Sequence, residues 1–354
     1  MSAYKDRLDA LWAAHTAPRA DDAPTVVSTF AGGGGSGLGY GAAGFRELLA
    51  VEWDKHAVAC LRRNFPHVHV HHGDIAKVDP SILDLAPGEL DVFDGSPPCQ
   101  GFSTNGNRQI DDPRNSLFRE YVRLLEAWQP KVLVMENVSG MVKGKMRSVF
   151  AEILAALKTA GPGYRVVARL MDCGYFGVAT MRQRVIIIGV REDLGIDPVH
   201  PAPQMRMPVL RHALEDLGDP GEILVPRGRI TTMAPLVLPG YDGGDVLESR
   251  GGRGAWYNLQ RAHWDRQCWT ITKSMAPGRH GILHPDENRF LSSREICRVQ
   301  GFPDAYDWGD SGLRDIWARV GNSVPPPLML AVASTIRDKI LTPARTGAQS
   351  STPN

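Results

Sequence analysis

The chain has 354 residues, a hydrophobic fraction of 43% and a formal net charge of +1. This length suggests about two domains and supports a sizeable buried core. The near-neutral charge excludes nucleic-acid binding through overall basicity, so any such binding requires a local basic face.

Five scattered cysteines form no Cys-x-x-Cys pair, so neither a metal site nor a disulfide framework is indicated. Such sparse use fits a reducing cytosol. The first residues are charged rather than apolar, and no apolar run is long enough to span a bilayer. We therefore expect a cytoplasmic protein without a membrane segment.

The first expected element is a short amphipathic helix at 4–16, followed by a polar linker to residue 24. Short apolar runs then alternate with helical segments, which predicts a doubly wound, Rossmann-like α/β sheet. Strands are expected at 26–30, 47–52, 68–71, 90–94, 132–136, 164–170 and 185–190. Helices are expected at 38–44, 54–64, 117–128 and 146–160.

The amino-acid composition changes after residue 195, where proline, glycine, arginine and tryptophan become frequent and the hydrophobic periodicity weakens. This change predicts a second, smaller, loop-rich domain. We expect an N-terminal helix and linker at 1–24, a first domain at 25–195 and 313–342, the second domain at 196–312, and a disordered polar tail at 343–354.

A glycine-rich turn, Gly32–Gly35, follows the first expected strand. Such a turn lets a ligand approach the backbone closely, and it commonly holds a nucleotide-like cofactor. Glu52, about 20 residues on, can accept ribose hydroxyls. Trp53 can stack on an adenine and Asp74 can accept from its amino group. The alternative for the turn is a flexible loop, for Trp53 a core side chain, and for Asp74 a helix cap.

Cys99 lies just past another strand, in a loop stiffened by Pro97 and Pro98. Most free cysteines are inert core residues, but a thiolate is a strong nucleophile even when little of it is ionised. The glycine- and asparagine-rich stretch 101–115 can close over a substrate.

Further polar residues lie at the ends of two later strands. Glu136 ends one strand, where a carboxyl group can donate a proton as well as hold one. Arg182 and Arg184 precede another strand and can bind a phosphate or a base carbonyl. The alternatives are an ordinary strand-end cap and a solvated charge pair.

In this order, the motifs resemble those of the cytosine-5 DNA methyltransferases of bacterial or phage type. The resemblance covers about 25–195 and 268–341. The matching motifs are Phe-Ala-Gly-x-Gly-Gly at 30–35, Pro-Cys-Gln at 98–100, Glu-Asn-Val at 136–138, Arg-x-Arg at 182–184 and Gly-Asn-Ser-Val at 321–324.

The resemblance implies a mechanism in which S-adenosylmethionine is the methyl donor and Cys99 attacks carbon 6 of cytosine. Glu136 would hold the ring at N3 and the amino group. Arg184 would contact the ring carbonyl oxygen, and Arg182 would support the loop. The target base must leave the duplex, because its ring edge is inaccessible inside it.

The resemblance also implies residues that bind the cofactor and the DNA, the latter mostly from 196–290, the place of the family's target-recognition region. The cofactor residues would be Phe30, Ala31, Gly32, Gly34, Gly35, Glu52, Trp53, Asp74, Ile75, Pro98, Leu117, Asn322, Ser323 and Val324. The DNA contacts would be Gln100, Ser103, Arg227, Arg229, Arg250, Arg253 and Arg261. We expect a monomer that acts on duplex DNA, with a cognate restriction endonuclease as a candidate partner.

Two positions depart from the family pattern. Ser28 stands where Asp is usual, and Thr180 stands where Gln is frequent. The first concerns the support of the glycine turn, and the second removes one polar contact near the flipped base. Neither alters Cys99 or Glu136, so we expect an active enzyme.

Three other functions compete with this interpretation. A branch of the same family methylates transfer RNA, but its Cys-Phe-Thr signature is absent from this sequence. A non-catalytic DNA-binding protein would not need Cys99 and Glu136. A small-molecule methyltransferase would leave the recognition-like segment without a role.

Overall fold

The structure, a computed structural model, describes residues 3–98, 116–252, 256–275, 277–278 and 280–350. The helices are α1 (Ala3–Thr16), α2 (Gly35–Ala42), α3 (Lys55–Asn64), α4 (Ser116–Trp128), α5 (Arg147–Thr159), α6 (Leu210–Leu214), α7 (Arg229–Met233), α8 (Gly243–Glu248), α9 (Ser293–Gln300), α10 (Leu313–Asn322), α11 (Pro326–Ile336) and α12 (Thr342–Ser350). The strands are β1 (Thr25–Thr29), β2 (Arg46–Glu52), β3 (His69–His72), β4 (Val92–Gly95), β5 (Val132–Val138), β6 (Tyr164–Asp172), β7 (Gln183–Arg191), β8 (Leu259–Arg261) and β9 (Gly281–Leu283).

These elements form two compact units. The sheet unit comprises Ala14–Met171, Gln183–Ala202 and Met329–Asn354. The loop-rich unit comprises Met1–Ala13, Asp172–Arg182 and Pro203–Leu328. Compact packing does not measure independent folding, so the domain limits expected from the sequence stay a prediction.

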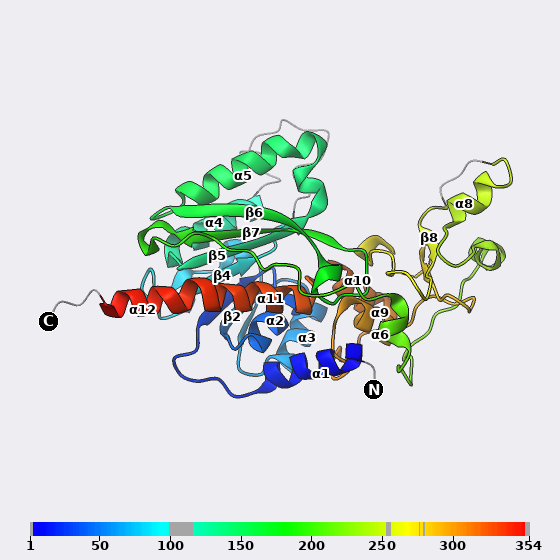
Figure 1. The fold of residues 1–354 in the computed structure, drawn as a ribbon, viewed down its shortest axis with the longest axis horizontal. Helices are drawn as coiled ribbons and strands as arrows, with labels where there is room; N and C mark the ends of the chain where they lie inside the picture. Colours follow the sequence, from blue (N-terminus) through cyan, green and yellow to red (C-terminus); the bar gives the residue numbers. More distant parts are fainter. Residues whose placement is uncertain (1–2, 99–115, 253–255, 276, 279, 351–354) are drawn as a thin grey trace. The chain divides into compact units, whose positions relative to one another are not determined.

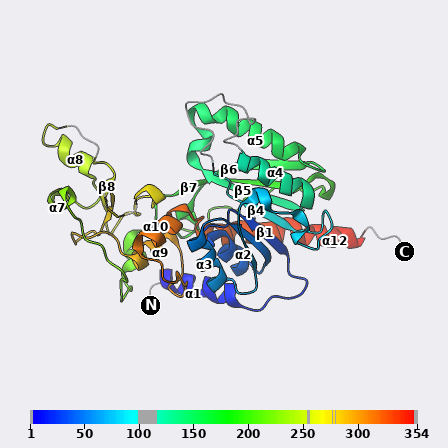
Figure 2. The same cartoon turned by 180° about the vertical axis from the view of Figure 1, so that it is seen from behind.

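The main sheet has, among the described residues, seven strands in the order β3-β2-β1-β4-β5-β7-β6. β1 runs parallel to β2 and β4, and β4 runs parallel to β5. Helices α4 and α5 lie on one face, and α2, α3 and α11 lie on the other (Figures 1 and 2). The doubly wound α/β fold expected from the sequence is thus confirmed. The antiparallel pairing of β7 with β5 is a feature that the apolar pattern did not predict.

The core of the sheet unit explains why its strands are apolar along their whole length. Phe93 of β4 stacks on Tyr121 of α4 with ring centroids 4.5 Å apart, and Leu133 of β5 joins the same cluster. The run 185–188 in β7 is fully buried because helices cover both sheet faces.

Two carboxyl groups are buried under the α2 side of this sheet. The hydroxyl of Tyr40 donates to Asp94 at 3.4 Å. Burial, reinforced by the charges of Glu47 and Glu136, raises the pKa of Asp94 well above its usual range. Burial also raises the pKa of Glu47 to about 7, although the nearby Ser28 hydroxyl opposes the shift. The departure at Ser28 therefore lies beside a carboxyl group supplied by the neighbouring strand.

Residues 343–350, part of the tail expected to be disordered at 343–354, are helical, because helix α12 continues to Ser350. The helical backbone runs on from α11 through a π-helical turn, and Arg345 donates to the Asp22 carbonyl at 2.9 Å. Its guanidinium also lies 3.2 Å from the buried carboxylate of Asp91. These long-range contacts favour an ordered helix, and local composition does not reveal them.

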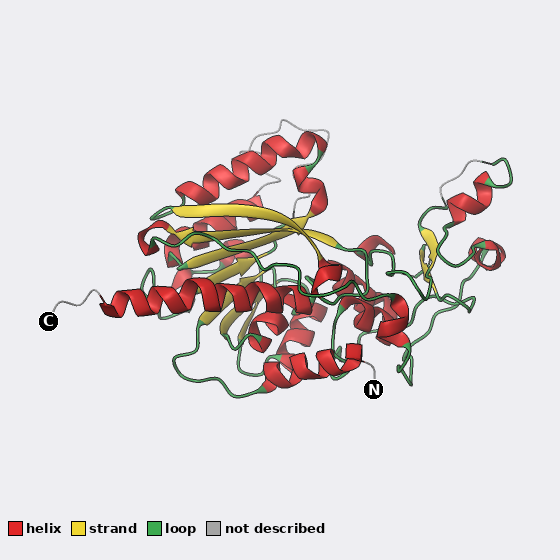
Figure 3. Ribbon diagram, in the orientation of Figure 1, coloured by secondary structure: helices red, strands yellow, loops and turns green. Residues whose placement is uncertain are grey.

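Loops make up most of the loop-rich unit around its two-stranded sheet, β8-β9 (Figure 3). A small core there contains Ile230, Leu259 and Phe290. Arg289 binds both carboxylate oxygens of Glu295 at 2.8 Å. Buried ion pairs therefore supplement a hydrophobic core of limited size.

Within the part of the chain that the structure describes, none of the helices combines the length and the hydropathy that a membrane crossing requires.

Candidate active site

The glycine turn after β1 has a strained backbone. Phe30 has φ 55°, Gly32 φ 54° and Gly34 φ 77°, all in the left-handed region. Glycine adopts this region readily, but a phenylalanine does so at a cost. Such strain is typical of ligand-binding turns, which agrees with the predicted role of this segment.

Glu52 ties the glycine turn to the end of β2. One carboxylate oxygen accepts from the Gly32 amide at 2.7 Å, and the other accepts from Trp53 and Asp54 amides, each at 2.9 Å. An ionised carboxylate has about four acceptor positions. Three are used by amides of the described residues, so one remains for a ligand hydroxyl.

Other predicted cofactor residues surround this edge of the sheet. Trp53 is 79% exposed, so its ring is open for stacking. Asp74 caps the turn after β3 by accepting from Ala76, as its alternative interpretation required. Ile75 is buried, and Leu117 packs at the margin of the core.

Asn137 is a positioning residue to which the sequence assigned no role. Its side-chain amide donates to the Pro97 carbonyl at 3.1 Å. This bond joins the loop that leads into exposed Pro98 to the end of β5. The Glu-Asn-Val motif contained this residue, but its partner in the loop is visible only in the fold.

Glu136 and Arg184 form an ion pair. Arg184 Nε lies 2.7 Å from Glu136 Oε1, and both side chains are largely buried. The antiparallel register places Val138 opposite Arg184 and Ile186 opposite Glu136, so the two charged groups are diagonal neighbours on one sheet face. The structure thus brings together the two predicted base-binding side chains from separate motifs.

Four predicted site residues, Cys99, Gln100, Ser103 and Arg253, lie outside the described residues.

Arg182 lies in the loop-rich unit and has a supporting position. Its guanidinium is fully buried and donates to the carbonyls of Ile271, Gly321 and Ser323 at 2.8–2.9 Å. Ser323 and Val324 are buried, whereas Asn322 is exposed. Arg182 therefore ties the Arg-x-Arg motif to the Gly-Asn-Ser-Val motif.

The predicted DNA-binding arginines of the loop-rich unit divide into two kinds. Arg227, Arg229 and Arg250 are exposed, so their charges are available to a ligand.

Arg261 requires a correction, because it is 4% exposed and all of its donors are used. Its acceptors are the carbonyls of Val237, His284, Glu287 and Ala234 and the side chain of Asn288. This arginine crosslinks the small core and has no donor left for DNA.

Thr180, the second departure, is also structural. Its hydroxyl donates to the Trp269 carbonyl at 3.0 Å, and the residue is fully buried. The position joins two segments of the loop-rich unit.

Comparison with protein families identifies one match over most of the chain. The family model of the C-5 cytosine-specific DNA methylases matches residues 25–232 and 241–338. Type II methyltransferase M.Sau96I of Staphylococcus aureus is 32% identical over 339 residues, which cover 88% of this chain and 75% of that protein. Type II methyltransferase M.NgoPII of Neisseria gonorrhoeae is 32% identical over 339 residues, which cover 88% and 95%.

Solved structures agree in fold. A prophage-encoded Escherichia coli protein superposes with a TM-score of 0.69 at 22% identity, over 90% of this chain and 100% of that one. A mutant of DNMT2 from Spodoptera frugiperda superposes with a TM-score of 0.64 at 18% identity, over 91% and 100%. At these identities the likeness concerns the fold alone.

Proposed function

The chain belongs to the C-5 cytosine-specific DNA methylase family and is a DNA (cytosine-5)-methyltransferase, and from this premise we propose how it works. We propose that it uses S-adenosylmethionine to methylate carbon 5 of a flipped-out cytosine in a specific duplex sequence. Cys99 forms a transient covalent bond to carbon 6 of that cytosine.

The residues at the carboxyl edge of the sheet unit fit the proposed donor. Glu52 retains an acceptor position for a ribose hydroxyl, and Trp53 offers an exposed ring for the adenine. Gly32 has no Cβ atom, which allows a ligand to approach the backbone closely. When bound, S-adenosylmethionine supplies an electrophilic methyl group.

The protein has to activate a carbon that is a poor nucleophile. The Cys99 thiolate adds to carbon 6 of cytosine, which moves an electron pair onto carbon 5. Carbon 5 then takes the methyl group, whose bond to the donor sulfur breaks and leaves its electron pair on that sulfur. A base or a water molecule then removes the proton from carbon 5, the ring double bond re-forms, and the thiolate leaves. Glu136 binds the N3 and amino edge and Arg184 the carbonyl oxygen, so that charge is stabilised as it develops.

One observation carries this proposal. The bond from Asn137 to Pro97 holds the start of the Cys99 loop at the end of the strand that carries Glu136. Cys99 is only two residues beyond Pro97. We infer from this anchor that the nucleophile acts at the edge of the sheet unit that carries the base-binding pair, as the addition requires.

Methyl transfer from labelled S-adenosylmethionine to duplex DNA or to transfer RNA tests the proposal. We expect label in DNA with the unmodified chain and none with Cys99→Ser. Cys268→Ser is the matched control, because burial raises the pKa of the Cys268 thiol to about 12 and removes it as a nucleophile at neutral pH. Label only in RNA, or full labelling of DNA by Cys99→Ser, would overturn the proposal.

The names of the relatives suggest a setting for the activity. Because M.Sau96I and M.NgoPII are both named Type II methyltransferases, we propose that this chain modifies a short sequence that a cognate restriction endonuclease cuts. We expect one chain per DNA site. Sedimentation of the chain with a duplex that contains a single recognition sequence measures that ratio. A complex of two chains per duplex would contradict this expectation.

A further inference from the structure

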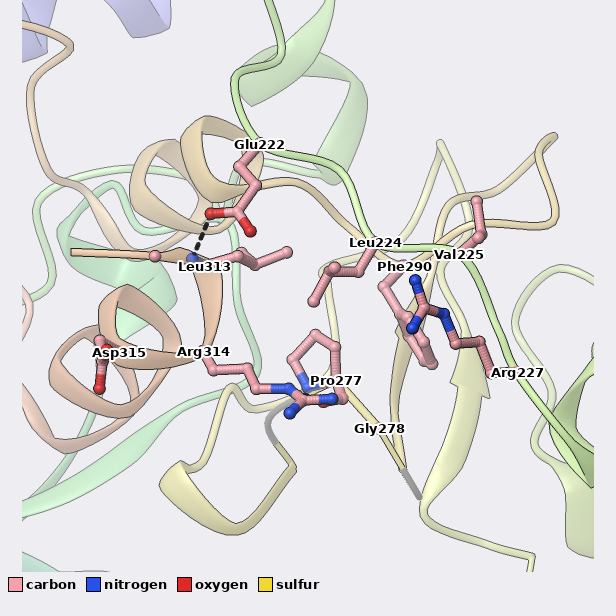
Figure 4. A pocket seen from close by; sticks show the side chains of 11 residues that line it. Glu222, Leu224, Val225, Arg227, Pro277, Gly278, Phe290, Leu313, Arg314 and Asp315 are labelled. Atoms are coloured by element: carbon pink, nitrogen blue, oxygen red, sulfur yellow. Dashed lines mark hydrogen bonds between the residues drawn. The ribbon is translucent and has the colours of Figure 1, made fainter. Parts of the chain in front are cut away.

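A cavity of about 390 Å³ lies within the loop-rich unit. Leu224, Pro277, Phe290 and Leu313 form its apolar walls. Arg314 and Arg227 point into it from opposite sides (Figure 4). Arg314 is the first-turn residue of α10, beyond the segment 196–312 that the sequence marked for target recognition.

The guanidinium of Arg314 is held in a defined orientation. Its Nε donates to the Pro277 carbonyl at 2.9 Å. One terminal nitrogen of Arg314 lies beside Gly278, where a Cβ atom would be at an ordinary contact distance of 3.4 Å. Among the described residues the Arg314 guanidinium has no other hydrogen bond, so both terminal nitrogens can face a ligand as a planar pair of donors.

The charge balance of the cavity favours a neutral ligand. Two carboxylates, Glu222 and Asp315, also line it, so its formal charges cancel. Glu222 caps α10 by accepting from the Leu313 amide at 2.5 Å, and the Asp315 carboxylate lies 3.7 Å from Arg319. A phosphate would meet these carboxylates as like charges, whereas the edge of a base would not.

We propose that Arg314 recognises a guanine in the methylated sequence, with its two terminal nitrogens donating to O6 and N7. Guanine is the base that presents two adjacent acceptors in the major groove, and arginine is its commonest bidentate partner. The inference rests on the proposal that duplex DNA is the substrate, and it names the specificity element of that site.

The decisive experiment first determines the recognition sequence: a random duplex library is treated with the unmodified chain, and the positions of 5-methylcytosine are mapped. Each guanine in that sequence is then replaced by 7-deazaguanine, which lacks the N7 acceptor. At one position we expect kcat/KM of the unmodified chain to fall at least about 5-fold. With Arg314→Ala, the same replacement should have no effect. The proposal would be overturned if the replacement lowered kcat/KM of Arg314→Ala as much as that of the unmodified chain. It would also be overturned if replacement of no guanine lowered kcat/KM of the unmodified chain.

A second variant keeps the inference testable if Arg314→Ala folds poorly. Glutamine pairs with adenine through N6 and N7, so Arg314→Gln should shift the preference at that position from guanine towards adenine. We expect the guanine-to-adenine ratio of kcat/KM to fall by about 5- to 150-fold.

Arg206→Ala is the matched control, because Arg206 is exposed, lies outside the residues that line the cavity and is not among the predicted DNA contacts. It should leave that guanine-to-adenine ratio unchanged. Arg314→Ala contradicts the base contact if it lowers methylation of all sequences equally and reduces the salt dependence of binding by about one phosphate. Absence of DNA methylation by the unmodified chain would instead refute the proposed function.

Discussion

The carboxyl edge of the sheet unit and the cavity of the loop-rich unit both depend on arginines, but they hold them differently. Arg184 pairs with Glu136 across two adjacent strands, in a register that the sheet imposes. Arg314 is oriented by a single loop carbonyl, that of Pro277. Regular structure places the residues proposed to carry the chemistry, whereas a loop contact places the residue proposed to read the sequence. Loop-borne recognition can vary without disturbing the chemistry.

The largest effect should come from Arg261→Met, which tests whether that arginine is structural. The change leaves five acceptors without their donor, three of them in buried hydrogen bonds, and we expect the free energy of unfolding to fall by at least about 3 kcal/mol. Urea unfolding measures the loss. Arg250→Met, at an exposed site, should change stability by less than about 0.5 kcal/mol. Equal stability of the two variants would return Arg261 to the candidate DNA contacts.

The next largest effect concerns the sheet edge. Glu136→Gln keeps the shape of the side chain but removes the charge that pairs with Arg184. We expect kcat for methyl transfer to fall by about 10²- to 10³-fold, as when one transition-state contact is lost. Asp193→Asn, which breaks the exposed pair with Arg191, is the control and should keep full activity. Full activity of Glu136→Gln would remove this residue from the mechanism.

A smaller effect should separate cofactor binding from the chemical step. Glu52→Gln removes the charge that accepts three backbone amides, and it weakens the remaining acceptor for a ribose hydroxyl. We expect KM for S-adenosylmethionine to rise by about 10- to 100-fold, with a smaller change in kcat. Asp79→Asn, at a turn cap that is not among the predicted cofactor residues, should leave KM unchanged. An unaltered KM in Glu52→Gln would contradict the assignment.

The smallest effect tests the buried carboxyl group of the sheet unit. Burial raises the pKa of Glu47 to about 7, so the folded state binds its proton more tightly than the unfolded state does. Stability from this group is present below its unfolded pKa and is lost as pH rises through about 7. Glu47→Gln should therefore stabilise the chain at pH 8, by about 1 kcal/mol, and much less at pH 5. Thermal unfolding of the variant and the unmodified chain at both pH values measures this gain in stability. An equal gain at pH 5 and pH 8 would contradict the proposed titration of Glu47.

The sequence predicts the sheet unit better than the loop-rich unit. The strands of the sheet unit were predicted because both faces are buried, which makes each strand a short apolar run, as in 185–188. That Glu52 lies beside the glycine turn could be predicted, because the carboxyl ends of parallel strands meet at one edge of a sheet. The direction of β7 was not predicted, because strand orientation depends on the connection and not on the pattern.

In the loop-rich unit, composition could identify arginines but not their partners. Arg261 and Arg250 look alike as sequence, yet one is buried among carbonyl groups and the other is exposed. Arg314 was overlooked because its carbonyl partner, Pro277, is 37 residues away in the chain. Contacts between distant loops leave no periodic signal.

The covalent step at Cys99 is the central claim, and a duplex containing 5-fluorocytosine tests it most directly. Fluorine at carbon 5 cannot leave as a proton does, so the thiolate cannot be expelled after methyl transfer. In the presence of S-adenosylmethionine, the unmodified chain should form a denaturation-resistant complex with this duplex, and Cys99→Ser should form none. A complex that persists in Cys99→Ser, or no complex from a chain that methylates ordinary duplex, would contradict the account.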